Sequence, residues 1–277
     1  GGVILYDETI KQTSSLKKII PELISDSGAI PGIKVDTGAK KQAQLNNETI
    51  TEGLDGLSER LKTYYDLGAR FAKWRGVFKI SIKNNLPSSE SIKSNAHALG
   101  RYSALVQEAN MVPIIEPEVL MDGDHDIKTC YQITKIVLEE TFDQLSNNNI
   151  NLKGIILKPN MILNGAESGI KNETKQVAEM TLNCLKENVP KDVPGIAFLS
   201  GGQTELEATK NLNEINKINN SNFIMSYSYG RALQQSALKF WSKDINNIRG
   251  TQDTFNHRAN MCSLAAQGKW SEELETK

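Results

Sequence analysis

The sequence contains little cysteine and no long apolar run. Its 277 residues include three cysteines, Cys130, Cys184 and Cys262, which are widely spaced and odd in number. That spacing fits neither a disulfide framework nor a zinc site, so reduced and buried thiols are expected. No apolar run approaches the ~20 residues that span a bilayer, and the first residues lack the pattern of a signal peptide. The sequence therefore predicts a cytoplasmic protein that does not enter the membrane.

No excess of either charge is present. Lysine and arginine number 32 against 33 aspartates and glutamates, which gives a formal net charge of −1. That balance argues against a nucleic-acid-binding protein, because such proteins carry a marked basic excess. The length and the 39% hydrophobic content suit one large globular domain. We therefore expect a single domain over residues 1–277.

Short apolar runs alternate with longer amphipathic segments along the chain. The short runs predict buried strands, and segments with apolar residues three and four apart predict helices. Strands that alternate with helices are typical of βαβ units and a parallel sheet. The expected strands are 3–6, 30–35, 71–80, 112–119, 154–157, 195–199 and 222–227. The expected helices are 54–65, 88–109, 126–145, 173–185, 204–212, 231–241 and 251–266.

The repeat length indicates the fold class. Polar residues at the ends of the expected strands (Lys34, Lys73, Glu116, Lys158 and Ser200) recur every 39 to 43 residues. This is somewhat longer than the roughly 30 residues per unit of a (β/α)₈ TIM barrel, so loop insertions are expected. An open doubly wound sheet is the alternative, but its glycine-rich fingerprint is missing. We expect one α/β barrel domain with a C-terminal helix and tail. Because seven strands are counted and the chain does not begin with Met, the first strand is expected upstream of residue 1.

Four of the expected strands carry charged residues where parallel strands are normally apolar. Side chains at positions i and i+2 of a strand lie on the same face. A structural salt bridge explains one such pair, but four strands with the same pattern favour a shared site at their C-terminal ends, where barrel enzymes place their chemistry. The charged residues are Lys34 and Asp36, Lys73 and Arg75, Glu116 and Glu118, and Lys158.

Two glycine-bearing turns follow the last two expected strands. Glycine lets backbone N–H groups approach a phosphate, and a following helix N-terminus favours negative charge. The charged pocket also holds five cations against three carboxylates when Arg231 is included. Together these features predict a phosphorylated substrate. The turn residues expected to bind it are Ser200, Gly201 and Gly202 in the first turn, and Ser228, Gly230 and Arg231 in the second.

Lys158 is the candidate nucleophile of this pocket. A cationic neighbour such as Lys73 depresses the pKa of a lysine, which frees the amine to attack a carbonyl carbon. Glu116 and Glu118 can then move protons while an imine forms and collapses. The pattern therefore predicts an enzyme that cleaves and re-forms a carbon–carbon bond in a sugar phosphate.

A metal-dependent sugar-phosphate lyase or isomerase on the same barrel is the competing hypothesis. The run from Asp122 to Asp126 resembles a ligand cluster, but the twelfth position of such a loop is Ile133 and not the glutamate of an EF-hand. The other histidines, His97 and His257, lie far away in expected helices. We interpret the run as a loop whose aspartates cap the next helix, and we expect no metal. A non-catalytic binding role is the third hypothesis.

Eight ordered motifs then identify the chain as similar to class I fructose-bisphosphate aldolases. They cover nearly its whole length, far more than a single short pattern would. The motifs lie at 32–36 (GIKVD), 53–60 (GLDGLSER), 71–75 (FAKWR), 116–118 (EPE), 122–126 (DGDHD), 157–161 (LKPNM), 198–203 (FLSGGQ) and 228–233 (SYGRAL).

The resemblance implies a (β/α)₈ barrel, usually a homotetramer, that works without a metal or other cofactor. It implies reversible cleavage of fructose 1,6-bisphosphate to dihydroxyacetone phosphate and glyceraldehyde 3-phosphate in glycolysis and gluconeogenesis. Lys158 matches the imine-forming lysine and Glu116 the main general acid/base. Lys73, Arg75 and Glu118 match residues that support proton transfer and hold the substrate, and Lys34 one that lines the site. Ser200, Gly201, Ser228, Gly230 and Arg231 match the residues that bind the ketose-side phosphate.

The sequence departs from the family pattern at both ends. The family's first strand carries an aspartate needed for cleavage, followed by a serine and an arginine that bind phosphate, and these residues are expected upstream of Gly1. The family's C-terminal tail often ends in a tyrosine, whereas this sequence ends in Lys277. We therefore expect Lys158 to form the imine in this chain, while bond cleavage depends on an acid that the chain does not contain.

Overall fold

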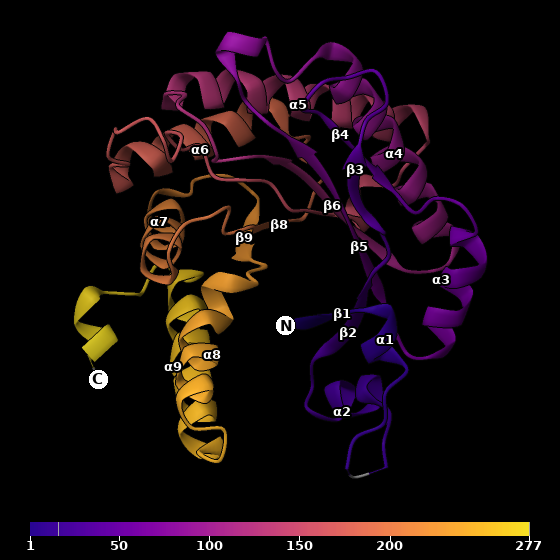
Figure 1. The fold of residues 1–277 in the computed structure, drawn as a ribbon, viewed down its shortest axis with the longest axis vertical. Coiled ribbons are helices and arrows are strands. Elements are labelled where there is room, and N and C mark those ends of the chain that lie inside the picture. The colour runs from indigo at the N-terminus through magenta and orange to yellow at the C-terminus, as the bar shows by residue number, and fades with distance from the viewer. Residues whose placement is uncertain (16, 277) are drawn as a thin grey trace.

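A curved parallel sheet dominates the computed structural model, which describes residues 1–15 and 17–276. Its strands are β1 (Gly2–Leu5), β2 (Ile30–Lys34), β5 (Phe71–Phe78), β6 (Val112–Val119), β7 (Ile156–Leu157), β8 (Gly195–Phe198) and β9 (Ile224–Tyr227). They pair in the order β1-β2-β5-β6-β7-β8-β9, and each pairing is parallel. In Figure 1 the strands form the inner arc of an open barrel, with β1 and β9 on opposite sides of the opening.

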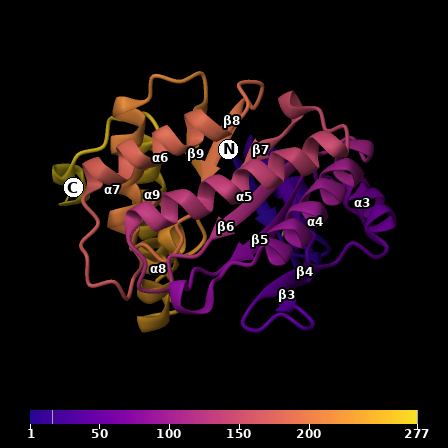
Figure 2. The same ribbon diagram turned by 90° about the horizontal axis from the view of Figure 1, so that it is seen from above.

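Helices cover the outer side of this arc. They are α3 (Leu57–Asp66), α4 (Ser89–Glu108), α5 (Ile127–Asn147), α6 (Thr174–Asn188), α7 (Glu205–Ile218), α8 (Arg231–Lys243) and α9 (Ile248–Ala265). Figure 2 shows α4, α5 and α6 lying side by side over the strands. Among the described residues, none of the helices combines the length and the apolarity needed to cross a membrane.

The seven expected strands and seven expected helices are confirmed, with ends that differ by a few residues. Sequence reasoning missed an antiparallel hairpin and two short helices. These are β3 (Gly38–Lys41) with β4 (Thr49–Glu52), α1 (Asp7–Ile10) and α2 (Ile20–Asp26). The hairpin was missed because β3 is polar and mostly exposed, so it lacks the apolar run of a buried strand. An eighth strand upstream of Gly1 stays a prediction.

The central strands β5 and β6 set the register of the polar residues. They pair over eight residues each, which places Arg75 level with Glu116. On the other side of β5, Lys34 of β2 lies level with Lys73. Strand β7 pairs with β6 only at Ile114 and Ile115. The charged side chains of neighbouring strands are therefore brought to similar heights at the C-terminal end of the sheet.

Trp74 and Tyr102 join β5 to α4 in the core. Both side chains are fully buried, and their ring centroids are 5.6 Å apart. The Tyr102 hydroxyl donates to the carbonyl oxygens of Ala72 (2.7 Å) and Ile114 (3.1 Å), so it bridges β5 and β6. Because Trp74 alternates with Lys73 and Arg75 along β5, its ring lies on the helix side while the charged residues face the other way.

The three cysteines are buried and form no disulfide with one another, as the sequence predicts. Burial raises the pKa of the Cys130 thiol to about 11 and that of Cys184 to about 12. Since the thiolate is the reactive form of cysteine, these thiols are unreactive near neutral pH.

Candidate active site

Five predicted site residues form a continuous chain of ion pairs across four strands. The Lys34 Nζ lies 2.7 Å from Asp36 Oδ1, and Asp36 Oδ2 lies 3.4 Å from Lys73 Nζ. Lys73 in turn lies 3.2 Å from Glu116 Oε2, and Glu116 Oε1 lies 2.9 Å from Lys158 Nζ. Cations and carboxylates therefore alternate from the end of β2, through β5 and β6, to the residue after β7. We call these five residues the ion-pair chain.

A second pair lies beside the ion-pair chain, two residues further along β5 and β6. The Arg75 Nε donates to a carboxylate oxygen of Glu118. Glu118 is buried, whereas the Arg75 side chain is 42% exposed. The i and i+2 spacing read from the sequence thus puts both pairs on one face, as expected. Arg75 is the member that reaches toward solvent.

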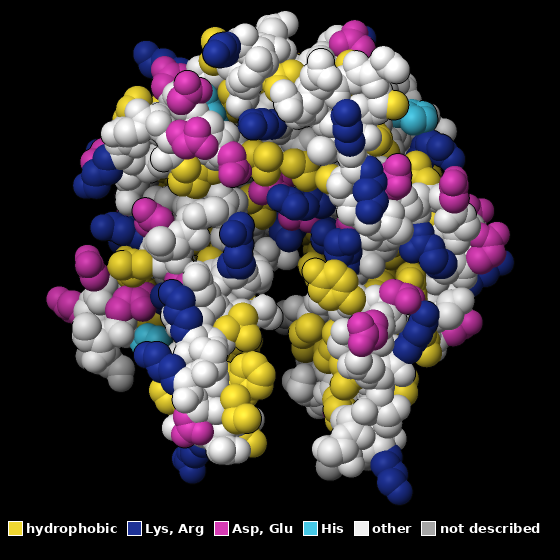
Figure 3. All heavy atoms as spheres, in the orientation of Figure 1, with side chains coloured by type: hydrophobic (Ala, Val, Ile, Leu, Met, Phe, Trp, Pro, Cys, Tyr) yellow, Lys and Arg dark blue, Asp and Glu magenta, His cyan; other side chains and the backbone are white. Residues whose placement is uncertain are grey.

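Burial makes the pairing inside the ion-pair chain obligatory. The side chains of Asp36 and Glu116 are only 2% and 4% exposed, and that of Lys73 is 9% exposed. An uncompensated charge in such surroundings costs several kcal/mol, whereas each carboxylate here lies between two lysines. Figure 3 shows dark blue and magenta side chains gathered in the hollow at the centre of the molecule.

The environment of Lys158 favours the free amine. Burial lowers the pKa of Lys158 below its ordinary value, and the neighbouring Lys73 acts in the same direction. Glu116 opposes this effect, because its carboxylate stabilises the ammonium form. The net result is a lowered pKa, which increases the fraction of neutral amine at a given pH.

The two predicted phosphate turns lie next to each other at the same end of the sheet. Strand β8 pairs with β9 up to Phe198 and Tyr227, and the Ser228 N–H donates to the Phe198 carbonyl (2.9 Å). In the first turn Gly201 and Gly202 have φ angles of +55° and +90°, a conformation that other residues rarely adopt. In the second turn α8 starts after Gly230 without a side-chain cap. Arg231, its first residue, is exposed.

A relay of buried amides supports the first turn. The Gln203 Nε2 donates to the Ser200 carbonyl (2.9 Å), and its own Oε1 accepts from Asn211 Nδ2 on α7 (2.7 Å). Both Gln203 and Asn211 are buried. The conformation around Ser200 is therefore fixed from the helix beneath it.

The acidic run at 122–126 serves as a helix cap, as the sequence predicts. The Asp126 carboxylate accepts from the Thr129 N–H (2.8 Å) at the start of α5. His125 is buried, and its ring nitrogens have no hydrogen-bond partner among the residues that the structure describes. Over residues 1–15 and 17–276, no group of three or more histidine, cysteine, aspartate or glutamate side chains is arranged to hold a metal.

Comparison with known proteins identifies the family. The family model for class-I fructose-bisphosphate aldolase matches residues 1–277. The chain belongs to the class-I fructose-bisphosphate aldolase family. It is 50% identical over 271 residues to the probable fructose-bisphosphate aldolase class 1 of Xanthomonas campestris, covering 98% of this chain and 80% of that protein. The fructose-bisphosphate aldolase of Dictyostelium discoideum is 45% identical over 276 residues, which cover 100% of this chain and 77% of that protein.

Two further aldolases extend the comparison. Cytosolic fructose-bisphosphate aldolase 4 of Arabidopsis thaliana is 45% identical over 276 residues, covering 99% of this chain and 70% of that protein. A solved fructose-bisphosphate aldolase from Plasmodium falciparum, in complex with TRAP and an inhibitor, has a TM-score of 0.95 at 42% identity. The match covers 98% of this chain and 78% of that one. The predictions of a TIM-barrel-type fold and of a lyase of the aldolase family are thus confirmed.

Sequence reasoning missed three polar residues that support the aldolase site. Gln203 and Asn211 hold the first phosphate turn, as described above. Arg60 donates to the backbone carbonyls of Val35, which precedes Asp36, and of Gly53. Gln203 and Arg60 fall inside motifs quoted for the family resemblance, but the partners of all three depend on the fold. None of the three lies in an apolar strand with a second charge two residues away, which is the pattern that revealed the charged pairs.

Proposed function

We propose that the Lys158 Nζ attacks the carbonyl carbon of fructose 1,6-bisphosphate and forms an imine with it. The supporting observation is the position of Lys158 at the end of the ion-pair chain. Its amine is 2.9 Å from Glu116 Oε1, and burial together with Lys73 lowers its pKa. A nucleophile with a shifted pKa within hydrogen-bond reach of a proton carrier is the arrangement that covalent catalysis needs.

Glu116 carries the protons of this mechanism. Attack of the free amine on the carbonyl gives a carbinolamine, and Glu116 protonates its hydroxyl so that water leaves and the C=N bond forms. The protonated imine then accepts the electron pair of the breaking C3–C4 bond as the C4 hydroxyl loses its proton to the carboxylate that the family resemblance implies for this step. Glyceraldehyde 3-phosphate then leaves, and an enamine remains attached to Lys158. A proton returned to C3 and addition of water release dihydroxyacetone phosphate and the free lysine.

The remaining predicted residues hold the substrate in this proposal. The ketose-side phosphate lies against Ser200, Gly201, Gly202, Ser228, Gly230 and Arg231. Glycine backbone and the uncapped start of α8 suit an anion there. Lys34, Asp36 and Arg75 contact the sugar chain and its second phosphate, while Lys73 and Glu118 assist Glu116.

Borohydride trapping tests the imine directly. The 277-residue chain is incubated with dihydroxyacetone phosphate, reduced with borohydride and mapped by mass spectrometry. We expect one adduct, on Lys158, and no adduct in Lys158→Met. Lys153→Met is the matched control, since its side chain is exposed and five residues away; it should label as the parent does. Labelling of a different lysine, or none in the parent chain, would overturn the proposal.

Three wider expectations belong to the same proposal. We infer a single domain over residues 1–277, a homotetramer and a cytoplasmic location. Support for the location comes from relatives named as cytosolic isozymes, and support for the tetramer from the family resemblance. Sedimentation at micromolar concentration tests the assembly, and a monomer there would contradict it.

A further inference from the structure

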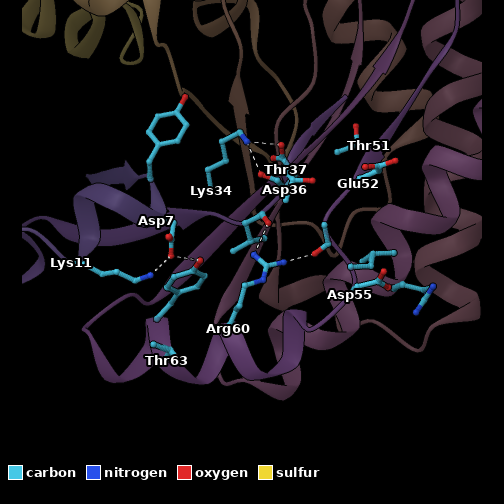
Figure 4. Close-up of a pocket in the computed structure, with 16 residues that line it drawn as sticks. Asp7, Lys11, Lys34, Asp36, Thr37, Thr51, Glu52, Asp55, Arg60 and Thr63 are labelled. Atoms are coloured by element: carbon cyan, nitrogen blue, oxygen red, sulfur yellow. Dashed lines mark hydrogen bonds and ion pairs between the residues drawn. The ribbon is translucent and has the colours of Figure 1, made fainter. Parts of the chain in front are cut away.

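Arg60 of α3 contacts the backbone next to a predicted site residue and the backbone of the segment packed against it. Its Nη1 donates to the Val35 carbonyl (3.0 Å), and its Nη2 donates to the Gly53 carbonyl. Val35 directly precedes Asp36, and Gly53 directly follows β4. In Figure 4 the dashed lines that leave the Arg60 side chain mark these two bonds, and Asp36 and Lys34 lie above it in the view. Arg60 therefore ties the end of β2 to the end of the β3–β4 hairpin.

The two backbone segments that Arg60 joins are in direct contact. The Thr37 N–H donates to the Glu52 carbonyl at 2.8 Å. Gly53 has a φ angle of +123°, and a Cβ placed there would lie 3.0 Å from the Thr37 nitrogen and 3.2 Å from the Val35 oxygen. The backbone from Val35 to Thr37 thus has little freedom while Arg60 is in place.

The carboxylate held by this backbone belongs to the ion-pair chain. Asp36 contacts Lys34 at 2.7 Å and Lys73 at 3.4 Å, and its Oδ1 also accepts from the Gly38 N–H at 3.1 Å. Lys73 is next to Glu116, which contacts Lys158. Displacement of the Asp36 backbone would therefore remove an anionic partner from Lys73 and disturb its position beside Glu116.

The outer side of Arg60 faces a cavity of about 1000 Å³. Arg60, Tyr64, Lys34 and Asp36 are among its lining residues (Figure 4). The Tyr64 hydroxyl donates to Asp7 Oδ1 (2.8 Å) on the same wall. A small cation that enters this cavity can reach the place of the guanidinium when the arginine side chain is truncated.

We propose that Arg60 is a positioning residue for imine formation, acting through the Asp36 carboxylate. Its planar fork meets two carbonyls at a fixed angle, which the single ammonium group of a lysine does not reproduce. Arg60 does not contact Lys73, Glu116 or Lys158 in any recorded hydrogen bond or ion pair of the described residues, so its effect passes through the backbone at 35–37. The inference rests on the proposed imine mechanism.

The rate of trapping on Lys158 measures this role. Arg60→Gln should lower the rate on the order of tenfold to a hundredfold, since sub-ångström misplacement of a catalytic group has effects of that size. The half-saturating concentration of dihydroxyacetone phosphate should change by less than about threefold, because Arg60 does not touch the substrate. Lys62→Gln is the matched control, as it removes the same charge from an exposed position on α3 and should trap like the parent.

A double-mutant cycle tests whether Arg60 acts through Asp36. Asp36→Asn and the double variant Asp36→Asn/Arg60→Gln should trap at the same rate. Once the Asp36 carboxylate is gone, Arg60 no longer holds an anionic partner in place, so its loss has no further effect. Rate losses that multiply would overturn the proposal. Arg60→Lys should be as slow as Arg60→Gln. A parental trapping rate in Arg60→Lys would show that the guanidinium's two simultaneous hydrogen bonds are not required, and it would contradict the proposal.

Chemical rescue distinguishes loss of the guanidinium group itself from a general folding defect of the variant. Adding millimolar guanidinium ion to Arg60→Ala should restore part of the trapping rate, while the Lys62→Gln control should not respond. Absence of rescue in a folded Arg60→Ala protein, judged by its circular dichroism, would count against the proposal. Failure of the imine mechanism is distinguishable, because the parent chain would then show no adduct on Lys158.

Discussion

The two halves of the candidate site are built from different materials. At the ends of β2, β5, β6 and β7 the site consists of charged side chains, most of them buried, and each is paired with an opposite charge. After β8 and β9 it consists of backbone in glycine turns and one exposed arginine, Arg231. In the proposed mechanism the first half controls protons and the reactivity of an amine. The second half leaves hydrogen-bond donors open for a ligand that brings its own charge.

This difference predicts how each half responds to substitution. Inside the ion-pair chain, loss of one charge removes a partner from a neighbour in buried surroundings, and loss of Glu116 leaves Lys158 without its carboxylate, so both stability and proton transfer should suffer. In the glycine turns, loss of a contact should weaken ligand binding and leave the chemistry of Lys158 intact. The predictions below test that division.

The largest effect is expected at Glu116. Glu116→Gln removes the proton carrier and should lower the rate of imine trapping by about 10²–10⁴-fold. It also removes the carboxylate that raises the pKa of Lys158, so the pH midpoint for labelling Lys158 should move down. Lys73→Met removes a cation that lowers this pKa, so its midpoint should move up. Labelling rate measured against pH gives both values.

If the pH midpoint for labelling Lys158 shifted equally and in the same direction in both variants, Glu116 and Lys73 would not act on the pKa of Lys158 with opposite signs, which would contradict the electrostatic argument. Lys79→Met serves as the control, because Lys79 follows β5 closely but is exposed and absent from the ion-pair chain. Its midpoint should match that of the parent.

Arg231→Gln should act on binding and not on chemistry. A charge-assisted hydrogen bond contributes about 1.5–3 kcal/mol, so the half-saturating concentration of dihydroxyacetone phosphate should rise roughly 10- to 100-fold. The maximal trapping rate should change little. The control Lys239→Gln removes an exposed charge from the same helix and should leave both values unchanged. Because Arg231 is exposed, added salt should reduce the difference between Arg231→Gln and the parent. A lower maximal trapping rate with an unchanged half-saturating concentration would contradict the assignment of Arg231 to ligand binding.

The smallest effect is expected one layer beneath the first glycine turn. Asn211→Leu removes the donor to Gln203 and loosens the amide that holds the Ser200 carbonyl. One hydrogen bond contributes about 1 kcal/mol, which corresponds to roughly a fivefold rise in the half-saturating concentration. Asn213→Leu is the control, because Asn213 lies on the same helix as Asn211 and its substitution also removes a buried hydrogen bond, the one that Asn213 Oδ1 accepts from the Trp270 N–H. Equal effects on saturation in both variants would assign Asn211 to stability alone.

Much of the sheet could be predicted because its strands are buried on both faces. Strand β6 is buried along nearly all of its length, so its apolar run stands out even around Glu116 and Glu118. Strand β3 could not be found in this way, since Lys40 and Lys41 are exposed and its pairing with β4 is set by the fold.

The candidate site divides along the same line. Lys73, Glu116 and Lys158 were found because charge within an apolar strand is a strong local anomaly. Arg60 and Asn211 lie on helices, where polar residues are ordinary. Their partners are the backbone carbonyls of Val35 and Gly53 and the amide of Gln203, which lie outside the helices that carry Arg60 and Asn211, so no regular helical spacing points to them.

The alternation of side chains along β5 gives the protein an intrinsic optical reporter. Trp74 lies between Lys73 and Arg75 in the chain, is fully buried and stacks on Tyr102. Indole fluorescence depends on local polarity and on nearby rings, so its emission will follow small movements of the strand that carries both cations. Once Trp241 and Trp270 are replaced by phenylalanine, ligand binding in the hollow can therefore be followed from the opposite face of the sheet without attaching a dye.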